Sequence, residues 1–398
     1  MSVLETLRER GFVAQVSDEV GLRRALEAGP ITLYQGFDPT ATSLHTGNLV
    51  GIMALAHFQK AGHRPIAVAG GGTGMIGDPT DRSSERPMLT LDELERNLAG
   101  IRQQFSRYLD FRDSRALLVN NADWLLELSY IPFLRDVGRH FTVNPLMQHG
   151  TYWERSEKGS FSFVELNYAL VQAYDFLHLF RAQGCILQIG GNDQWFNILA
   201  GVDLIRRAEG GKQAFALTTP LVTTTSGEKL GKSAGNAIWL DPELTSPYDF
   251  YQYWRNTEDA DVGRFLRLFT FLALDEIADL ERLSGAAINQ AKERLAFEAT
   301  RITHGEEAAQ AAQETARARF AHDGDDRGPF LQVSQPTRVV DLAYEAGLVG
   351  SRRDAKRQLE AGGLRLGEEK LATDRLVEPS ELPKLLSLGK RKIRLVAG

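Results

Sequence analysis

The segment from residue 31 to residue 69 constrains the fold most, because its pattern is strand, polar loop, helix and second strand. Apolar residues predict a short strand over 31–37 and, from Leu49 onward, a helix. A second apolar run covers 65–69. A strand, a helix and a strand at this spacing form a βαβ unit, which implies a parallel sheet. We therefore predict an α/β fold.

The polar loop between the first strand and the helix is the first candidate binding site. It contains Asp38, Thr40 and His45. In an open α/β sheet, ligands bind where strands end and helices begin. The first N–H groups of a helix lack partners there, and the helix dipole favours negative charge. We expect this loop to contact an anionic ligand.

A second set of polar residues follows the apolar strand predicted over 185–189. The sequence Gly190-Gly-Asn-Asp-Gln-Trp195 again places polar groups at the end of a strand. The helix predicted over 161–180 carries Tyr168, Gln172 and Asp175 on one face. A solvated stripe is the ordinary meaning of such a pattern, but the flanking positions are apolar, which favours a polar binding wall. Two strand ends and one helix face then define a single crevice.

Two further loops carry candidate groups. The glycine run from 70 to 77 lacks a following Gly-Lys-Ser/Thr, so we do not interpret it as a phosphate-binding loop. Asp78 follows that run as a carboxylate at the end of the segment. The loop 226–235 contains Lys229 and Lys232, which would suit a mobile clamp on phosphates, although the loop by itself could be an ordinary exposed one.

The remaining pattern predicts the other elements and a four-part organisation. A helix with a capping box starts at Thr90. The helix predicted over 131–141 could belong to the core or to a subunit interface. We also predict strands at 117–119 and 221–225, a first domain over 1–244, a helical domain over 245–320, a polar linker over 321–336 and a small domain over 337–398.

Composition and charge limit the class of protein. No apolar run approaches the length of a membrane span, so we expect a cytoplasmic protein without a membrane partner. Cys185, the single cysteine, excludes an internal disulfide and fits a buried core thiol. The histidines show no metal-ligand spacing with it, so we expect no structural metal.

The charge is unevenly distributed along the chain. Net charge is −6, but residues 351–398 contain twelve Lys/Arg and seven Asp/Glu, a balance of +5. A helix capped by Ser351 pairs Arg352 with Lys356 and Arg353 with Arg357 at i, i+4, and a hairpin is predicted over 364–371. A basic module on an acidic body suggests a local polyanion site.

Four motifs together resemble those of the bacterial tyrosyl-tRNA synthetases, which are class I aminoacyl-tRNA synthetases. They are Gly36-Phe-Asp-Pro39, His45-Thr-Gly-Asn48, Gly190-Gly-Asn-Asp-Gln-Trp195 and Lys229-Leu-Gly-Lys-Ser233. The tail around 351–363 is similar to the ribosomal-protein-type RNA-binding module that ends such enzymes. The resemblance implies a Rossmann-like catalytic domain, an α-helical domain and a small α+β RNA-binding domain. It also implies a homodimer that uses ATP and magnesium to attach L-tyrosine to the terminal adenosine of tRNA-Tyr.

The resemblance also implies roles for individual residues. Tyr34 and Asp175 would bind the phenol hydroxyl. The ammonium group would contact Asp78, Tyr168 and Gln172, and Gln194 completes the predicted tyrosine site. The predicted catalytic residues, which act on the phosphates, are Thr40, His45, Arg82, Arg86, Lys229 and Lys232. The other predicted ATP contacts are Gly36, Asp38, Gly47, Asn48, Gly191 and Asp193, and the predicted RNA contacts are Arg352, Arg353, Lys356 and Arg357.

The chain departs from the family pattern at three positions, and three other interpretations compete. Asn48 stands where many members have a second histidine, Asn192 replaces a more usual serine, and Gln35 occupies a position where cysteine is common. The tryptophan-specific relatives share the fold and the two signature motifs, which here are His45-Thr-Gly-Asn48 and Lys229-Leu-Gly-Lys-Ser233. A nucleotidylyltransferase with a similar helix-start histidine would lack the basic tail. A catalytically silent RNA-binding protein on the same scaffold would not need Thr40 and His45.

Overall fold

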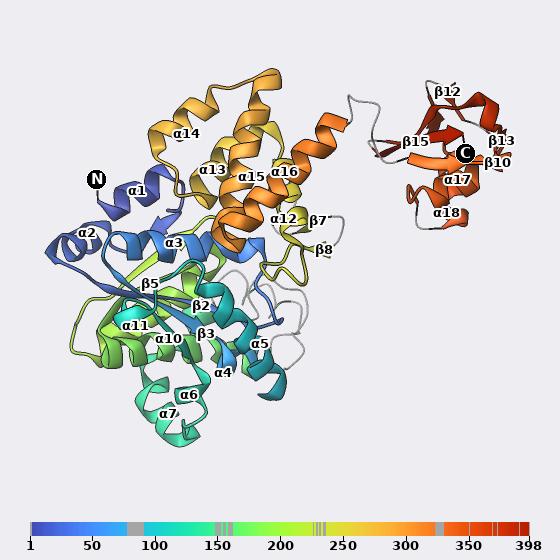
Figure 1. Cartoon of the computed structure of the whole chain (residues 1–398). Coiled ribbons are helices and arrows are strands. Elements are labelled where there is room, and N and C mark those ends of the chain that lie inside the picture. The colour runs from blue at the N-terminus through green and yellow to red at the C-terminus, as the bar shows by residue number, and fades with distance from the viewer. Residues whose placement is uncertain are drawn as a thin grey trace. The chain divides into compact units, whose positions relative to one another are not determined.

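The computed structural model describes residues 2–77, 91–147, 153, 157, 162–225, 227, 230, 232–233, 236–322, 330–349, 351–367, 369–371, 373–389 and 391–397. The chain divides into two compact units, Met1–Gln313 and Glu314–Gly398. The first unit contains the predicted catalytic region and most of the predicted helical region. Figure 1 shows both units with their elements labelled.

A six-stranded sheet forms the centre of the first unit, in the order β1-β6-β5-β2-β3-β4. The strands from β6 to β4 are parallel, and the short β1 pairs antiparallel with β6. Helix α3 lies on one side of this sheet, and α10 and α11 lie on the other (Figure 1). The predicted α/β fold with a parallel sheet is confirmed. The strands are β1 (Gln15–Val16), β2 (Thr32–Phe37), β3 (Arg64–Ala69), β4 (Leu117–Asn120), β5 (Cys185–Gly191) and β6 (Phe215–Thr219).

The sheet is buried because helices cover both of its faces, as parallel sheets require. Phe176 of α10 and Leu204 of α11 pack with Ile66 and Val68 of β3 in one apolar cluster. Cys185 belongs to the same cluster and is fully buried, and burial raises the pKa of its thiol. The prediction of a core thiol is therefore confirmed.

The strand predicted over 221–225 is wrong. The strand lies earlier in the chain, at β6, where every residue is buried and pairs with β5. Pro220 ends it, because proline has no N–H to donate to a strand ladder. Leu221, the first residue of the predicted strand, is 56% exposed.

Helices connect and extend the sheet. The helix predicted over 131–141 is shorter than expected: α7 ends at Asp136, and a single 3₁₀ turn covers Gly138–His140. The helices that surround the sheet are α1 (Val3–Glu9), α2 (Glu19–Ala28), α3 (Leu49–Lys60), α4 (Gly71–Gly74), α5 (Leu91–Phe105), α6 (Ala122–Leu125), α7 (Tyr130–Asp136), α8 (Val143–Met147), α10 (Phe163–Gln183) and α11 (Trp195–Ala208).

After the sheet, the short hairpin strands β7 (Lys232–Ser233) and β8 (Asn236–Ala237) precede a run of helices. Trp254 is fully buried there and contacts Phe250, Phe265 and Phe269 through its ring. The helices are α12 (Pro247–Arg255), α13 (Val262–Phe269), α14 (Leu274–Glu281), α15 (Ile288–His304) and α16 (Glu306–His322).

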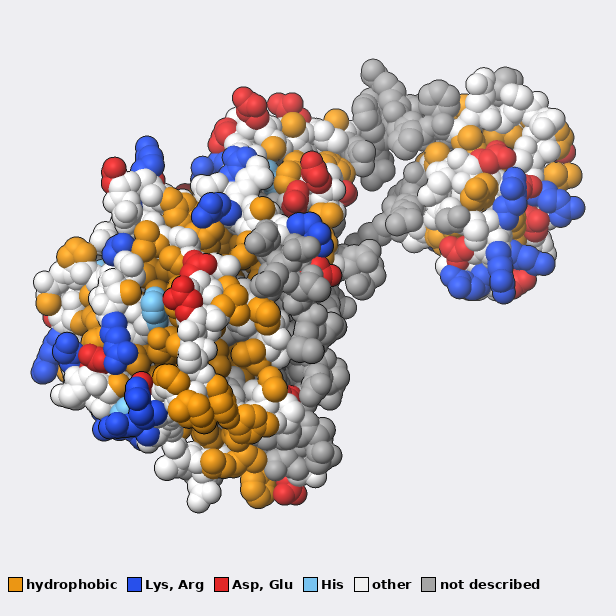
Figure 2. Space-filling view, turned by 90° about the horizontal axis from the view of Figure 1, so that it is seen from below, with side chains coloured by type: hydrophobic (Ala, Val, Ile, Leu, Met, Phe, Trp, Pro, Cys, Tyr) orange, Lys and Arg blue, Asp and Glu red, His pale blue; other side chains and the backbone are white. Residues whose placement is uncertain are grey.

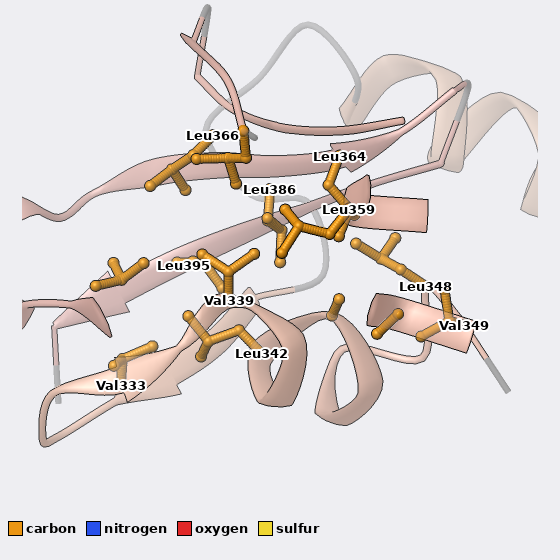
Figure 3. Close-up of a cluster of buried hydrophobic side chains, with 14 residues drawn as sticks. Val333, Val339, Leu342, Leu348, Val349, Leu359, Leu364, Leu366, Leu386 and Leu395 are labelled. Atoms are coloured by element: carbon orange, nitrogen blue, oxygen red, sulfur yellow. The ribbon is translucent and has the colours of Figure 1, made fainter. Parts of the chain in front are cut away.

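The second unit is a small α+β module. Its leucine and valine side chains, which include Leu359, Leu364 and Leu386, form one buried cluster between two helices and a sheet (Figure 3). Strand β9 pairs in parallel with β15, so residues 330–333, predicted as part of the linker, belong to this sheet. The elements are β9 (Phe330–Val333), β10 (Thr337–Arg338), α17 (Val339–Glu345), α18 (Arg352–Glu360), β11 (Leu364–Leu366), β12 (Glu369–Lys370), β13 (Leu376–Val377), β14 (Lys384–Leu388) and β15 (Arg391–Ala397).

Candidate active site

A cavity of about 370 Å³ opens where β2 and β5 end and where α3 begins. This is the edge of the sheet at which the sequence predicts the binding crevice. Residues from β2, from the polar face of α10 and from the loop after β5 therefore meet in one place. The predicted site residues that line the cavity are Tyr34, Gly36, Asp38, Thr40, His45, Gly47, Asn48, Tyr168, Gln172, Asp175, Gly191, Asp193 and Gln194.

A buried phenol and a buried carboxylate line the deep end of the cavity. Tyr34 is 2% exposed and Asp175 is 4% exposed. The Tyr34 hydroxyl has no hydrogen-bond partner among the described residues. Burial raises the pKa of Tyr34 well above its usual value, with a smaller contribution from Asp175. Burial likewise raises the pKa of Asp175 to about 7. A ligand hydroxyl at this end would find both a donor and an acceptor.

Two residues that sequence reasoning missed hold the Asp175 carboxylate. Asn121 Nδ2 donates to Asp175 Oδ2 at 2.9 Å, and Trp124 Nε1 donates to Asp175 Oδ1 at 2.7 Å. These hydrogen bonds lower the pKa of Asp175 and so oppose part of the effect of burial. The indole of Trp124 also stacks on His178, with ring centroids 4.5 Å apart.

A signal for one of these two residues was present in the sequence. Asn121 directly follows β4, so it stands at a strand end like the polar residues after β2 and β5. Its Oδ1 also accepts a hydrogen bond from the Gly72 N–H, at 2.8 Å. No local pattern marks Trp124, because its partner Asp175 lies 51 residues away in the chain.

The His45-Thr-Gly-Asn48 motif forms a 3₁₀ turn that leads into α3. His45 Nδ1 accepts the Gly47 N–H at 3.0 Å, and Asn48 Oδ1 accepts the His45 N–H at 3.0 Å. Asn48, one of the three departures from the family pattern, therefore caps the turn that carries His45. The turn directs the helix start, where backbone N–H groups and the helix dipole favour an anion, into the cavity.

Gln35, another departure, lies against Gly51 in the first turns of α3. A Cβ at residue 51 would lie 2.1 Å from Gln35 Nε2, so the glycine makes room for this longer side chain. Gln35 Oε1 is buried without a hydrogen-bond partner among the described residues, as is Oε1 of Gln188 on β5. Both glutamines line the cavity, and sequence reasoning gave neither of them a role.

The loop after β5 forms the third wall. Gln194 Nε2 donates to Asp193 Oδ2 at 3.1 Å, and Asn197 Nδ2 donates to Gln194 Oε1 at 3.3 Å. Asn192, the third departure, accepts hydrogen bonds at Oδ1 from Gln15 Nε2 at 2.6 Å and from the Thr218 hydroxyl at 3.0 Å. Asn192 thus connects this loop to β1 and β6.

Several predicted residues lie outside the described part of the structure. Asp78, Arg82, Arg86 and Lys229 are among them, and of Lys232 only the backbone is described, in β7. Their roles remain predictions. Within the described residues, no group of three or more His, Cys, Asp or Glu could hold a metal ion, and no helix is long and apolar enough to cross a membrane.

Helix α18 in the second unit has the predicted capped start. Ser351 caps the helix, because its Oγ accepts the Asp354 N–H at 3.1 Å. Arg352 is bound to Asp341, and Arg357 is bound to Asp354. A hollow beside this helix is lined by Ser351, Arg353, Asp354, Lys356, Arg357 and Glu360.

The chain matches a family model, curated relatives and solved structures. The family model described as tRNA synthetases class I (W and Y) matches residues 26–321. The chain is 50% identical to the tyrosine–tRNA ligase of Caldanaerobacter subterraneus subsp. tengcongensis, over 93% of this chain and 92% of that one. It is 47% identical to the tyrosine–tRNA ligase of Syntrophus aciditrophicus, over 99% and 98% of the two chains. A C-terminally truncated mitochondrial tyrosyl-tRNA synthetase from Aspergillus nidulans superposes with a TM-score of 0.72 at 31% identity, over 80% of this chain and 94% of that one.

Proposed function

Since this chain belongs to the class I tRNA synthetases of the tryptophan and tyrosine group, we propose that it uses ATP to join L-tyrosine to tRNA-Tyr. The observation that carries the choice of tyrosine is that Tyr34 and Asp175 are both buried, line the same cavity and interact electrostatically. A phenol hydroxyl can donate to the carboxylate and accept from the Tyr34 hydroxyl. An indole would not need that pair.

Discrimination against phenylalanine follows from the same pair. Phenylalanine would leave both buried polar groups without a partner, and an unpaired buried polar group is costly. Tyrosine-specific synthetases are the standard example of this effect, and they select tyrosine over phenylalanine by a factor of about 10⁵. Tyr168 and Gln172 line the cavity on the same face of α10 as Asp175, where we place the ammonium group of the substrate.

The proposed reaction has two steps. An oxygen of the tyrosine carboxylate attacks the α-phosphorus of ATP, and the bond from that phosphorus to the pyrophosphate leaving group breaks. A hydroxyl of the terminal adenosine of the tRNA then attacks the tyrosyl carbonyl, and AMP leaves. No bond to the protein is needed, so the residues act by positioning the reactants and by stabilising charge.

We assign the phosphates to the start of α3, beside Thr40 and His45, both of which line the cavity. Gly36, Asp38, Gly47, Asn48, Gly191 and Asp193 would surround the rest of the nucleotide. Lys229, Lys232, Arg82 and Arg86 would supply positive charge as pyrophosphate forms. Magnesium would enter with ATP, because phosphate oxygens are ligands that it prefers, and it would offset their negative charge.

We propose that a second copy of this chain covers an apolar surface formed by α6, α7, α8 and the start of α10. Helices α7, α8 and α10 pack on one another through Phe133, Leu146 and Leu170. Trp124 and Leu125 of α6 belong to a second cluster that also contains Phe133. Figure 2, seen from the side on which α6 and α7 lie in Figure 1, shows hydrophobic side chains gathered on this face. The exposed apolar side chains are Leu126 at the C-cap of α6 and, within these elements, Tyr130, Ile131, Leu134, Val143, Phe163 and Val164. An apolar patch of this kind is typical of a protein interface.

Helix α18 is the proposed tRNA contact of the second unit. Among the described residues, Arg353 and Lys356 form no ion pair, whereas Arg352 and Arg357 are bound to carboxylates. Figure 2 shows Lys and Arg side chains gathered on part of this unit. We therefore expect Arg353 and Lys356 to contribute most to phosphate binding. With tRNA as its substrate, we place the protein in the cytoplasm.

Pyrophosphate exchange tests the proposal directly. The full chain is incubated with ATP, labelled pyrophosphate and one of tyrosine, tryptophan or phenylalanine. Exchange with tyrosine alone would support both the reaction and the pocket assignment. Exchange with tryptophan would refute the roles of Tyr34 and Asp175. Absence of exchange with every amino acid would favour an RNA-binding protein that is catalytically silent.

A further inference from the structure

Helix α5 carries buried polar residues that do not line the cavity. Asn97, Gly100 and Gln104 are spaced by three and four residues, so they lie on the same side of the helix. Asn97 and Gln104 are each 8% exposed. Buried carboxamides need hydrogen-bond partners, and both find them in the loop between β2 and α3.

All three residues contact the backbone of that loop. Asn97 Nδ2 donates to the carbonyl oxygen of Pro39 at 2.7 Å. Gln104 Oε1 accepts the Leu44 N–H at 2.8 Å. Between them, Gly100 faces the carbonyl oxygen of Thr42 so closely that a Cβ there would lie 2.0 Å from it. The helix therefore holds the loop at both ends and in the middle.

The hydroxyl of Ser43 joins this helix to a third segment. Ser43 Oγ accepts hydrogen bonds from Gln104 Nε2 at 3.0 Å and from the Asp241 N–H at 3.2 Å, and it donates to the Leu44 carbonyl at 2.7 Å. A hydroxyl has one proton to donate and two lone pairs, so its capacity is used completely.

The segment 238–241 completes the enclosure of the loop. The Leu240 N–H donates to the Leu44 carbonyl at 2.9 Å, and the Thr46 N–H donates to the Ile238 carbonyl at 2.9 Å. His45 forms a single antiparallel bridge with Trp239 between these two bonds. The backbone next to His45 is thus hydrogen-bonded to α5 on one side and to the segment 238–241 on the other.

Thr40 lies between the anchor at Pro39 and the anchors at 42–44, and His45 follows the last of them. Both line the cavity, whereas Asn97, Gly100 and Gln104 do not. We propose that Ser43, Asn97, Gly100 and Gln104 are positioning residues that hold Thr40 and His45 in place for the reaction at the ATP phosphates. This inference rests on the proposed function, because it takes Thr40 and His45 to be the phosphate contacts.

The physical reason is that catalysis without a covalent intermediate depends on placement. The loop has no regular secondary structure of its own, so its shape comes from these side-chain contacts. A displacement of about 1 Å can reduce a rate by about 100-fold. The pocket for the tyrosine ring, in contrast, is built from β2, β5 and α10, so tyrosine binding should not depend on the loop.

The test uses Gly100→Ala, Gln104→Leu and Ser43→Ala in the full chain. In Gly100→Ala, the added methyl group requires the Thr42 carbonyl to withdraw by about 1 Å, since real contacts of this kind do not fall below 3.0 Å. Gln103→Leu is the matched control, because it makes the same chemical change on the exposed face of α5. Each protein is assayed for kcat and KM of ATP in pyrophosphate exchange, and for the Kd of tyrosine without ATP.

We expect kcat to fall by about 100-fold in Gly100→Ala and by about tenfold in Gln104→Leu and Ser43→Ala, with tyrosine Kd within about twofold of the wild type. Gln103→Leu should match the wild type. Wild-type rates in Gly100→Ala and Gln104→Leu would overturn the inference, and so would a parallel loss of tyrosine binding, which would mean a general structural role. If the wild type showed no tyrosine-dependent exchange, the proposed function itself would fail, and the inference with it.

Discussion

Replacing Trp124 by phenylalanine should alter tyrosine binding through the charge of Asp175. Trp124 is 8% exposed, and phenylalanine keeps an aromatic ring beside His178 while removing the donor to Asp175 Oδ1. The pKa of Asp175 is already about 7 because the carboxyl is buried. The hydrogen bonds from Asn121 and Trp124 lower this pKa and so keep it from rising further. Loss of one of these bonds should therefore raise the pKa.

The expected size follows from the strength of the lost bond. A hydrogen bond to a charged group contributes roughly 1.5 to 3 kcal/mol, and one pKa unit corresponds to about 1.4 kcal/mol. The pKa of Asp175 should rise from about 7 to between about 8 and 9. At pH 7.5, the ionised fraction would fall from roughly three quarters to about one tenth. If the carboxylate is the form that accepts the substrate hydroxyl, the Kd of tyrosine should rise about eightfold.

Equilibrium dialysis with labelled tyrosine, without ATP, measures this Kd between pH 6 and pH 9. The direction of the pH dependence is distinctive. As pH falls, the affinity of the wild type for tyrosine should weaken around pH 7, whereas the affinity of the variant should begin to weaken at a higher pH. The ratio of the two Kd values should therefore shrink to less than about twofold at pH 9. Titration of the free amino acid affects both proteins equally and cancels in the ratio.

Trp254→Phe is the matched control, because the Trp254 Nε1 is buried without a hydrogen-bond partner among the described residues and the ring does not line the cavity. The same chemical change there should leave the pH profile unaltered. A ratio for Trp124→Phe that stays constant from pH 6 to pH 9 would refute the reasoning, because the loss would then not depend on protonation of Asp175.

Three further perturbations test other parts of the proposal. Tyr34→Phe removes the buried hydroxyl, so selection of tyrosine over phenylalanine in pyrophosphate exchange should fall by about tenfold, the effect of one hydrogen bond; unchanged selectivity would remove Tyr34 from the phenol site. Replacing Arg353 and Lys356 together by glutamine should weaken tRNA binding and reduce the slope of log affinity against log salt by about 1.4 to 1.8, whereas an unchanged slope would mean that α18 does not contact phosphates. Ile131→Arg, at a side chain that is 70% exposed on the apolar surface, should shift the protein toward monomer in sedimentation velocity, and Val20→Arg, at a 61% exposed position on α2, should not.

Much of the fold was predictable because its signals are local. The strand and helix pattern from residue 31 to residue 69 is enough to require a parallel sheet, and the structure has one. Polar residues at strand ends face ligands in such sheets, and one predicted helix has a polar face. These two patterns predicted that Asp38, Tyr168 and Asp193 share one site, and all three line the same cavity. Ser351 and its helix were also predictable, because a cap and its helix are neighbours in sequence.

The errors arose where neighbouring residues do not decide the outcome. Residues 215–219 form the strand and 221–225 do not, because pairing with β5 and the position of Pro220 select the first segment. Residues 330–333 follow a linker-like sequence, yet they form β9 and pair with β15 near the end of the chain.

What the sequence by itself determined is the set of chemical groups and the edge of the sheet at which most of them gather. Only the tertiary structure decided how those groups are held. The donors to Asp175 lie 51 and 54 residues away from it, and Gln104 lies 60 residues from its partner Leu44. Contacts of this kind leave no periodic trace in the chain, because they depend on how separate elements pack after each has formed.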